Sequence, residues 1–345
     1  MNSKELLNAS LNMEETDRVP IFLFDLSLGM DVLDIRTTDI YGSGYDGKLA
    51  GKCILALQKY LGHDVVAGSY QSVNIRAFGG EMEYPERGIP YARKFPFKNA
   101  EDLYKHEGNE IEGYMQGSID SFSTIRLTEP NLGLMMNIPV PFSMAVMMRG
   151  LEPMLMDLLL EPAYSKDLIS FGKDVMHTSI ECVAESVELD AILMTGSSDN
   201  PDLIGSDALK KFSYPGLRDS VRFVHEHDIP IMFHPHGGFT SDPDSEKVLD
   251  EIIEMGMECL YYGEAIDSVK MKNHAEEKCS LCGGVDTFTT IFMGSEERIK
   301  KDVSEYLKIH DRNYIFSASC SVDRGISLER MKMMTDAVRS FPSRF

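Results

Sequence analysis

The feature that most constrains the fold is a regular alternation of short apolar runs and longer helical segments from about residue 150 onward. Apolar runs bounded by polar or glycine-rich turns are typical of buried strands, and apolar residues spaced three and four apart are typical of helices. The strand-like runs cover 190–200, 229–238, 258–266, 278–287 and 313–321, and the helical segments cover 150–187 with a break at Pro162, 206–228, 241–256, 267–277, 295–310 and 327–341. Strands that alternate with helices in this way form βαβ units and a parallel sheet.

An α/β fold of the (β/α)8 type, the TIM barrel, fits this pattern best, and 345 residues lie within its usual size range. Residues 18–29 are expected to form the first barrel strand. The region 70–145 is less regular, so we expect it to hold an irregular N-terminal extension or insertion, such as a hairpin layer. Since the sequence has no evident linker or internal repeat, we expect one domain over 1–345. A doubly wound open sheet is the alternative fold.

The charge of the chain narrows the range of partners. Asp plus Glu outnumber Lys plus Arg by 55 to 34, which gives a net charge of −21. Such a field repels nucleic acid and anionic lipid and suits a basic protein partner, although acidity can also serve solubility alone. No apolar stretch is long enough to span a membrane, and the first residues lack the apolar core of a signal peptide, so we expect a cytoplasmic protein. Neither G-x-G-x-x-G nor a Walker loop occurs, so the sequence gives no support for nucleotide binding.

A barrel places its functional groups at the carboxyl ends of its strands, and polar side chains follow the predicted strands of this chain. "IPIMFHPHGG" ends in His234 and His236, which would point to the same side of an extended strand. The polar residues at all such ends are Asp25, Asp199, Asn200, His234, His236, Glu264, Cys282, Asp286 and Cys320.

Five of these residues are of the types that bind zinc: His234, His236, Glu264, Cys282 and Cys320. Each also has a structural interpretation. The two histidines can be hydrogen-bonded structural groups, and both cysteines can be small core residues. Glu264 can be an acid at a helix N-terminus. The CxxC at 279–282 has no partner CxxC, so a structural zinc ribbon is not supported.

At these residues the chain resembles the uroporphyrinogen decarboxylase superfamily, which includes the corrinoid (cobamide)-dependent methyltransferases. The resemblance is carried by "DRVP" at 17–20, "PVPFSMAVMMRGLEPMLMDLLLEP" at 139–162, "NPDLIGSDALKKFSYPGLRDSVRFVHEHDIPIMFHPHGG" at 200–238, "GGVDT" at 283–287 and "SASCSVDRGISLERMKMM" at 317–334. It implies a (β/α)8 barrel. The arginine-rich N-terminal motif of true porphyrinogen decarboxylases is missing, because "IFLFDLSLGMDVLDI" contains no arginine. Decarboxylation of uroporphyrinogen is therefore disfavoured.

The methyltransferase branch holds zinc through a His-x-Cys motif and a later cysteine. The resemblance thus implies zinc at His234, His236 and Cys320, with His236 where a cysteine is usual, and Glu264 or Cys282 as a fourth ligand. Neutral imidazole in place of a thiolate makes the metal a stronger Lewis acid, which suits a poor leaving group. We therefore expect a zinc-dependent methyltransferase that moves a methyl group between a small methylated donor, a methoxylated aromatic or other methyl ether or a methylamine, and the cobalt of a corrinoid protein.

The remaining roles are assigned from position at the strand ends. Glu264 and Asp286 are the expected catalytic residues, and Asp25, Asp199, Asn200 and Phe233 are the expected substrate-binding residues. The alternatives are a methyltransferase from methylcorrinoid to a thiol of the coenzyme M type or to tetrahydrofolate, a decarboxylase of another acid, and a non-catalytic protein that binds a corrinoid or a metal. The sequence predicts neither the identity of the donor nor the direction of transfer.

Overall fold

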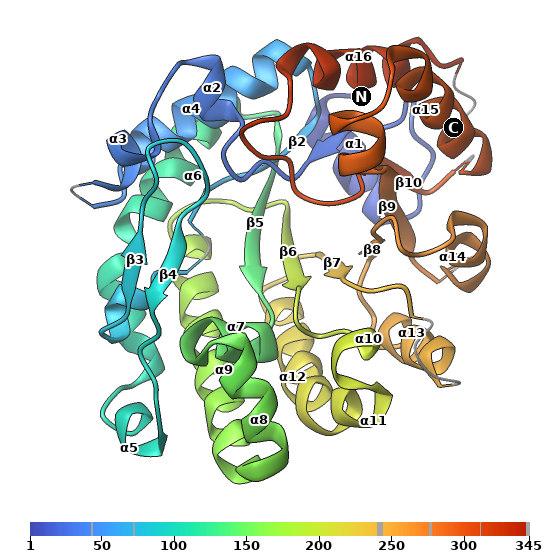
Figure 1. The fold of residues 1–345 in the computed structure, drawn as a ribbon. Helices are drawn as coiled ribbons and strands as arrows, with labels where there is room; N and C mark the ends of the chain where they lie inside the picture. The colour runs from blue at the N-terminus through green and yellow to red at the C-terminus, as the bar shows by residue number, and fades with distance from the viewer. Residues whose placement is uncertain (43, 72, 240–243, 276–277, 311, 343–345) are drawn as a thin grey trace.

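Eight parallel strands form the central sheet, in the order β1-β2-β5-β6-β7-β8-β9-β10. The computed structural model describes residues 1–42, 44–71, 73–239, 244–275, 278–310 and 312–342 (Figure 1). The sheet strands are β1 (Phe22–Leu23), β2 (Val65–Ala67), β5 (Gly133–Pro139), β6 (Ala191–Gly196), β7 (Ile231–Pro235), β8 (Cys259–Tyr261), β9 (Ser280–Val285) and β10 (Tyr314–Ala318). A parallel bridge between Ile21 and Phe316 joins the first strand to the last. The expected (β/α)8 barrel is therefore confirmed.

Helices surround the sheet and connect its strands, as Figure 1 shows. The α-helices are α1 (Ser3–Leu11), α2 (Gly29–Val32), α3 (Thr37–Tyr41), α4 (Gly47–Leu61), α5 (Ala100–Leu103), α6 (Gln116–Thr128), α7 (Pro141–Arg149), α8 (Leu151–Leu160), α9 (Pro162–Ala184), α10 (Pro201–Ile204), α11 (Ser206–Ala208), α12 (Tyr214–His225), α13 (Ser245–Ile253), α14 (Ser268–Ala275), α15 (Glu296–Ile309) and α16 (Leu328–Ser340). Short 3₁₀ or π turns form η1 (Ile75–Phe78), η2 (Gly108–Tyr114), η3 (Leu209–Ser213) and η4 (Thr287–Phe292). No helix among the described residues has the length and apolar character needed to cross a membrane.

The interior of the barrel is filled by stacked layers of side chains. The strands of an eight-stranded barrel with a shear of about eight are tilted, so paired residues on neighbouring strands do not lie at the same height. To stay at one height, the register is followed from strand to strand and shifted by about one residue toward the carboxyl end at each step. Applied to the observed register, this rule gives layers of four inward residues from alternate strands: Val65, Ala191, Cys259 and Ile315; then Phe22, Met135, Met232 and Cys282; then Ala67, Leu193, Tyr261 and Ser317; and finally Phe24, Asn137, His234 and Gly284.

Two observations support these layers and show which end of the barrel is open. The apolar members of the layers form one buried cluster, separate from the core between sheet and helices, and Leu7 and Leu11 of α1 belong to it. Helix α1 therefore closes the amino-terminal end of the barrel with apolar side chains. The layer nearest the carboxyl ends contains the first polar inward residues with unsatisfied atoms, Asn137 and His234.

The irregular region 70–145 contains the expected hairpin but also the strand β5 and the helix α6, which the sequence analysis did not separate from it, and β2 lies just before it. Strands β3 (Glu81–Glu83) and β4 (Tyr91–Lys94) form an antiparallel pair outside the barrel. The strands β2 and β5 and the helix α6 are regular barrel elements. The break at Pro162 is confirmed, since α8 ends at Leu160 and α9 begins at Pro162. Of the predicted helices 241–256 and 267–277, residues 241–243 and 276–277 lie outside the described residues.

Candidate metal centre

His234 lies on the inward face of β7, because Phe233 and Ile231 point outward into the core between sheet and helices. Its Nδ1 is 2.6 Å from the carbonyl oxygen of Tyr261 on the next strand. The Nδ1–H therefore donates to this carbonyl, and the lone pair is left on Nε2. Nε2 is buried and has no hydrogen-bond partner among the described residues. A histidine whose second nitrogen donates to a carbonyl is the usual arrangement of a metal ligand.

His236 follows two residues later, and its ring centroid lies 4.5 Å from that of His234. The chain can turn here because Gly237 has a φ of +92°, and a Cβ at this position would lie 2.7 Å from Oδ2 of Asp202. Burial, together with the neighbouring His236, lowers the pKa of His234 to about 3. Burial also lowers the pKa of His236. Both imidazoles are therefore neutral, as metal ligands must be.

Cys320 reaches the same point through an irregularity at the seam of the barrel. Ile21 pairs with Phe316, whereas Asp25 pairs with Val322. The chain therefore advances six residues from Phe316 to Val322 while the facing chain advances four from Ile21 to Asp25. The two extra residues lie in the segment that contains Cys320. A bulge of this kind re-aims side chains and is common beside active sites. Here it brings Sγ of Cys320 to 4.0 Å from Nε2 of His236.

Ligand atoms of His234, His236 and Cys320 all lie within 4.8 Å of one another, and they form the metal-binding group found among the described residues. Two nitrogens and one sulfur are a donor set that zinc prefers, and three protein ligands leave a fourth position open, as in catalytic zinc sites. The cluster lines a cavity of about 50 Å³, together with Gly263, Glu264 and Ser319. The unsatisfied Nε2 of His234 is the observation that best fits a bound metal.

The other two predicted ligands, Glu264 and Cys282, lie outside the three-residue group. Glu264 lines the same cavity with an exposed side chain and opposes the fall in the pKa of His236, but it does not belong to the three-residue group. Cys282 is not brought to the cluster. It lies in the barrel interior, two layers below His234, and burial raises its pKa well above the ordinary value. The strand-end prediction failed for Cys282 because three more residues of β9 follow it.

Asp25 and Asp199 are buried and have partners within the protein. The carboxylate of Asp25 accepts hydrogen bonds from the backbone N–H groups of Ser27, Leu28 and Gly29 and from the hydroxyl of Tyr70. Asp199 accepts from the hydroxyls of Ser143 and Ser213. Burial raises the pKa of both carboxyls to about 7. Both carboxyl groups thus hold neighbouring segments together through hydrogen bonds within the protein.

The remaining candidates are also engaged elsewhere. Asn200 caps α10 by accepting from the N–H of Leu203. Asp286 caps η4 by accepting from the N–H groups of Phe288 and Thr289, each at 2.8 Å. Phe233 is fully buried on the outer face of β7 and does not face the cavity, which corrects its assignment as a substrate-binding residue. None of these residues belongs to the three-residue group or lines its cavity.

Two polar residues at the mouth were not predicted. Asn137 on β5 and Asp323 after β10 each carry a buried, unpartnered Oδ1. A signal for Asn137 exists in the sequence, because it is the one amide within the apolar run "LMMNIPV". Asp323 has no such signal, since its inward direction depends on the bulge at the seam.

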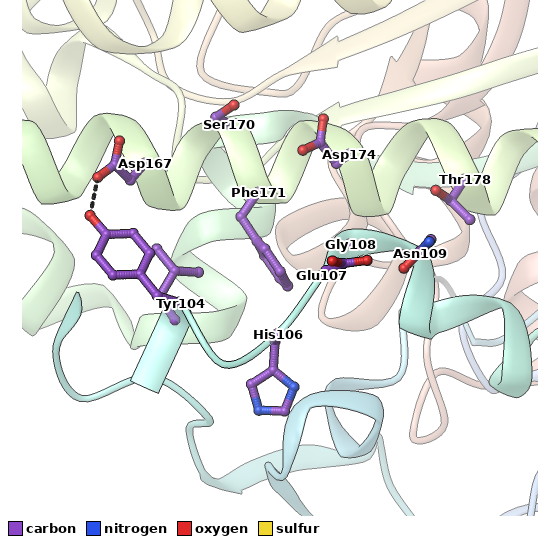
Figure 2. A pocket seen from close by; sticks show the side chains of 11 residues that line it. Tyr104, His106, Glu107, Gly108, Asn109, Asp167, Ser170, Phe171, Asp174 and Thr178 are labelled. Atoms are coloured by element: carbon purple, nitrogen blue, oxygen red, sulfur yellow. Dashed lines mark hydrogen bonds between the residues drawn. The ribbon is translucent and has the colours of Figure 1, made fainter. Parts of the chain in front are cut away.

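A larger cavity, of about 530 Å³, lies between α9 and the segment from α5 to η2 (Figure 2). Its polar groups include Asp167, Asp174 and Glu107, and the hydroxyl of Tyr104 donates to Asp167. None of the predicted site residues lines it. It is a groove on the helical layer, apart from the carboxyl ends of the strands where a barrel holds its functional groups.

Fold and cluster together define a (β/α)8 barrel protein with a candidate His-His-Cys metal centre at the carboxyl ends of its strands. The profile of the uroporphyrinogen decarboxylase (URO-D) family matches residues 2–341, so the chain belongs to this family. Its sequence is 20% identical to uroporphyrinogen decarboxylase of Chlorobium limicola over 149 residues, 41% of this chain and 40% of that protein. It is 18% identical to the same enzyme of Chlorobium chlorochromatii over 201 residues, 53% of this chain and 54% of that protein. The matches thus span about half or less of the curated relatives.

Solved structures share the fold over nearly the whole chain. A methyltransferase from Methanosarcina mazei superposes with a TM-score of 0.83 at 19% identity, and the match covers 99% of each chain. A B12-independent methionine synthase from Shewanella sp. W3-18-1 superposes with a TM-score of 0.56 at 9% identity, over 93% of this chain and 96% of that one. At these identities the likeness establishes the fold alone.

Proposed function

We propose that the protein is a zinc-dependent methyltransferase that moves a methyl group between a small methylated compound and the cobalt of a corrinoid carried by a partner protein. One observation carries the proposal: two neutral imidazoles and a thiol converge at the mouth of the barrel, and one imidazole nitrogen there is buried without a partner. The family assignment and the fold shared with the Methanosarcina mazei methyltransferase support it.

His234, His236 and Cys320 would hold the metal. Bound there, zinc would supply Lewis acidity at the atom from which the methyl group leaves. The chain contributes the rest: the carbonyl of Tyr261 fixes the orientation of His234, and burial keeps both imidazoles neutral. Two imidazoles with a single thiolate leave more positive charge on the metal than a shell with two thiolates. This charge assists the departure of a poor leaving group such as an alkoxide or an amine. Glu264, at the edge of the cavity, is proposed as the fourth ligand or as an acid–base group.

A decarboxylase of a polycarboxylate is less well supported, although the curated relatives carry that name. No arginine occurs between Arg18 and Arg36, the segment that contains the first strand and its loop. Arg324, near the mouth, is paired with Asp31, and its side chain is only 5% exposed. A net charge of −21 also repels a substrate with many carboxylates.

The experiment has two arms. Metal analysis of the purified protein is expected to give about one zinc per chain, and about none for Cys320→Ala. Cob(I)alamin is then incubated with a panel of methyl ethers and methylamines, and formation of methylcobalamin is followed by its absorbance. Methylcobalamin incubated with thiols tests the alternative function, transfer from the methylcorrinoid to a thiol. A protein that lacks zinc, or a His236→Ala variant with full activity, would overturn the proposal.

A further inference from the structure

Five buried side-chain atoms of the described residues have no hydrogen-bond partner: His63 Nδ1, Asn137 Oδ1, Tyr164 Oη, His234 Nε2 and Asp323 Oδ1. Buried polar atoms are nearly always paired, because an unpaired one has lost its water without compensation. The atoms of Asn137, His234 and Asp323 all come from residues at the carboxyl ends of barrel strands. Three unsatisfied groups at one mouth indicate that a ligand satisfies them.

Asn137 lies level with His234. It pairs with Leu193 on β6, which pairs with Met232 on β7, and the residue level with Asn137 is therefore His234, two positions beyond Met232. The other two members of this layer are Phe24 and Gly284. Gly284 contributes no side chain, and a Cβ there would lie 1.9 Å from the carbonyl oxygen of Ser317. The layer that holds Asn137 and His234 therefore contains one other side chain, the ring of Phe24.

Asp323 faces the same mouth from the seam. Val322 pairs with Asp25 and is buried in the outer core, so the alternation of an extended chain directs Asp323 inward. It is the third residue after Cys320 in the chain. Asp323 nevertheless does not belong to the metal-binding group. Asp323 is therefore a neighbour of the metal-binding group in the chain and not one of its ligands.

We infer that Asn137 and Asp323 bind the substrate of the metal centre, and that the substrate presents an N–H or O–H group to them beside the atom that carries the methyl group. The inference rests on the proposed function and narrows its substrate class. Both unsatisfied atoms are oxygens that accept hydrogen bonds, so an amine or a hydroxylated methyl ether satisfies them. A fully methylated ether would leave both unpaired. Sites built to hydrogen-bond an O–H or N–H reject analogues that lack it by up to about 10⁴-fold.

The test uses the full chain loaded with Co²⁺, whose visible absorption reports ligands at the open position. Imidazole and N-methylimidazole are the probes, because both bind a metal through the same ring nitrogen and only imidazole keeps an N–H. Wild type is expected to bind imidazole about tenfold more tightly than N-methylimidazole, the effect of one hydrogen bond. Asn137→Leu should lose this preference while keeping its cobalt, and Asn137→Asp, which keeps an acceptor oxygen, should retain it.

Stability supplies a second readout that needs no ligand. Removal of an unpaired buried oxygen is expected to leave the melting temperature of metal-free Asn137→Leu equal to or above that of wild type. Tyr164→Phe is the matched control, since it removes an unpartnered oxygen that lies on α9. It should behave in the same way in melting and keep the preference for imidazole.

Each outcome is decisive. The inference is overturned if wild type binds the two probes equally or if Asn137→Leu keeps the preference for imidazole. A lower melting temperature of Asn137→Leu also overturns it, because that result would show that Asn137 has a structural role. Failure of wild type to take up cobalt or zinc overturns the proposed function instead, so the two failures are distinguishable.

Discussion

A single backbone carbonyl determines what His234 can do. The carbonyl oxygen of Tyr261 accepts a hydrogen bond from Nδ1–H, and the ring of Tyr261 stacks on the imidazole with centroids 4.1 Å apart. The ring is thus fixed in one tautomer and one orientation before any metal arrives. Preorganisation of this kind removes the cost of ordering a ligand at the moment of binding.

The titration of the three side chains predicts how zinc binding depends on pH. Burial raises the pKa of Cys320, so its thiol is protonated in the metal-free protein and loses its proton when the metal binds. The pKa of His234 is lowered to about 3 and that of His236 is lowered as well, so neither imidazole has a proton to release. We expect release of one proton, and zinc affinity that rises about tenfold per pH unit between about pH 6 and pH 8. Calorimetry in buffers of different ionisation enthalpy counts the proton. Release of two protons, or the same release from Cys320→Ala, contradicts the assignment.

A His236→Cys variant tests the contribution of the second imidazole. A thiolate at this position lowers the positive charge on the metal and its power as a Lewis acid. Zinc content should be retained, whereas methyl transfer to cob(I)alamin should fall by about tenfold, about 1.4 kcal/mol in activation free energy. The measurement compares zinc content and transfer rate in the same preparation. An unchanged or higher rate would show that the imidazole is not needed for leaving-group activation.

Among the secondary-structure elements, β9 and β10 leave no space for a side chain at Gly284. A Cβ there would lie 1.9 Å from the carbonyl oxygen of Ser317, and backbone cannot move aside. Gly284→Ala should therefore lower the free energy of unfolding by about 3 kcal/mol, at the upper end for overpacking. Gly263→Ala is the matched control, because its nearest contact would be 3.5 Å away, and it should change stability by about 0.5 kcal/mol at most. Denaturant unfolding measures both, and equal losses would contradict the packing argument.

The same elements show how much of the fold and site the sequence could predict. Strands β6 to β10 were predicted because each is an apolar run between clear helical segments. Strand β2 has only three residues, and β5 runs directly into the helix that begins at Pro141, so neither has a boundary that local pattern reveals. His234 and His236 share a face by simple alternation. Cys320 reaches them only because of a bulge that depends on pairing between the two ends of the chain, which no local pattern encodes.

For the whole molecule, the candidate centre connects strands that are not neighbours. β7 and β10 are separated in the sheet by β8 and β9, and the seam between β10 and β1 is closed by isolated bridges. A metal held by His234, His236 and Cys320 would link β7 directly to the segment that follows β10. Since the unfolded chain cannot assemble the three ligands, zinc should bind the folded state preferentially.

We therefore expect zinc to stabilise the whole barrel. A free zinc concentration of about 1,000 times the dissociation constant adds about 4 kcal/mol to the free energy of unfolding when only the folded state binds zinc. Thermal unfolding with zinc and with a chelator measures the difference as a shift in melting temperature. Cys320→Ala should abolish the shift, whereas Cys182→Ala, which removes a half-buried thiol on α9, should keep it. Because both variants lose one cysteine, any nonspecific binding of zinc to thiols falls equally in the two. A shift of the same size in Cys320→Ala would mean that zinc stabilises the protein elsewhere and that the mouth of the barrel is not its site.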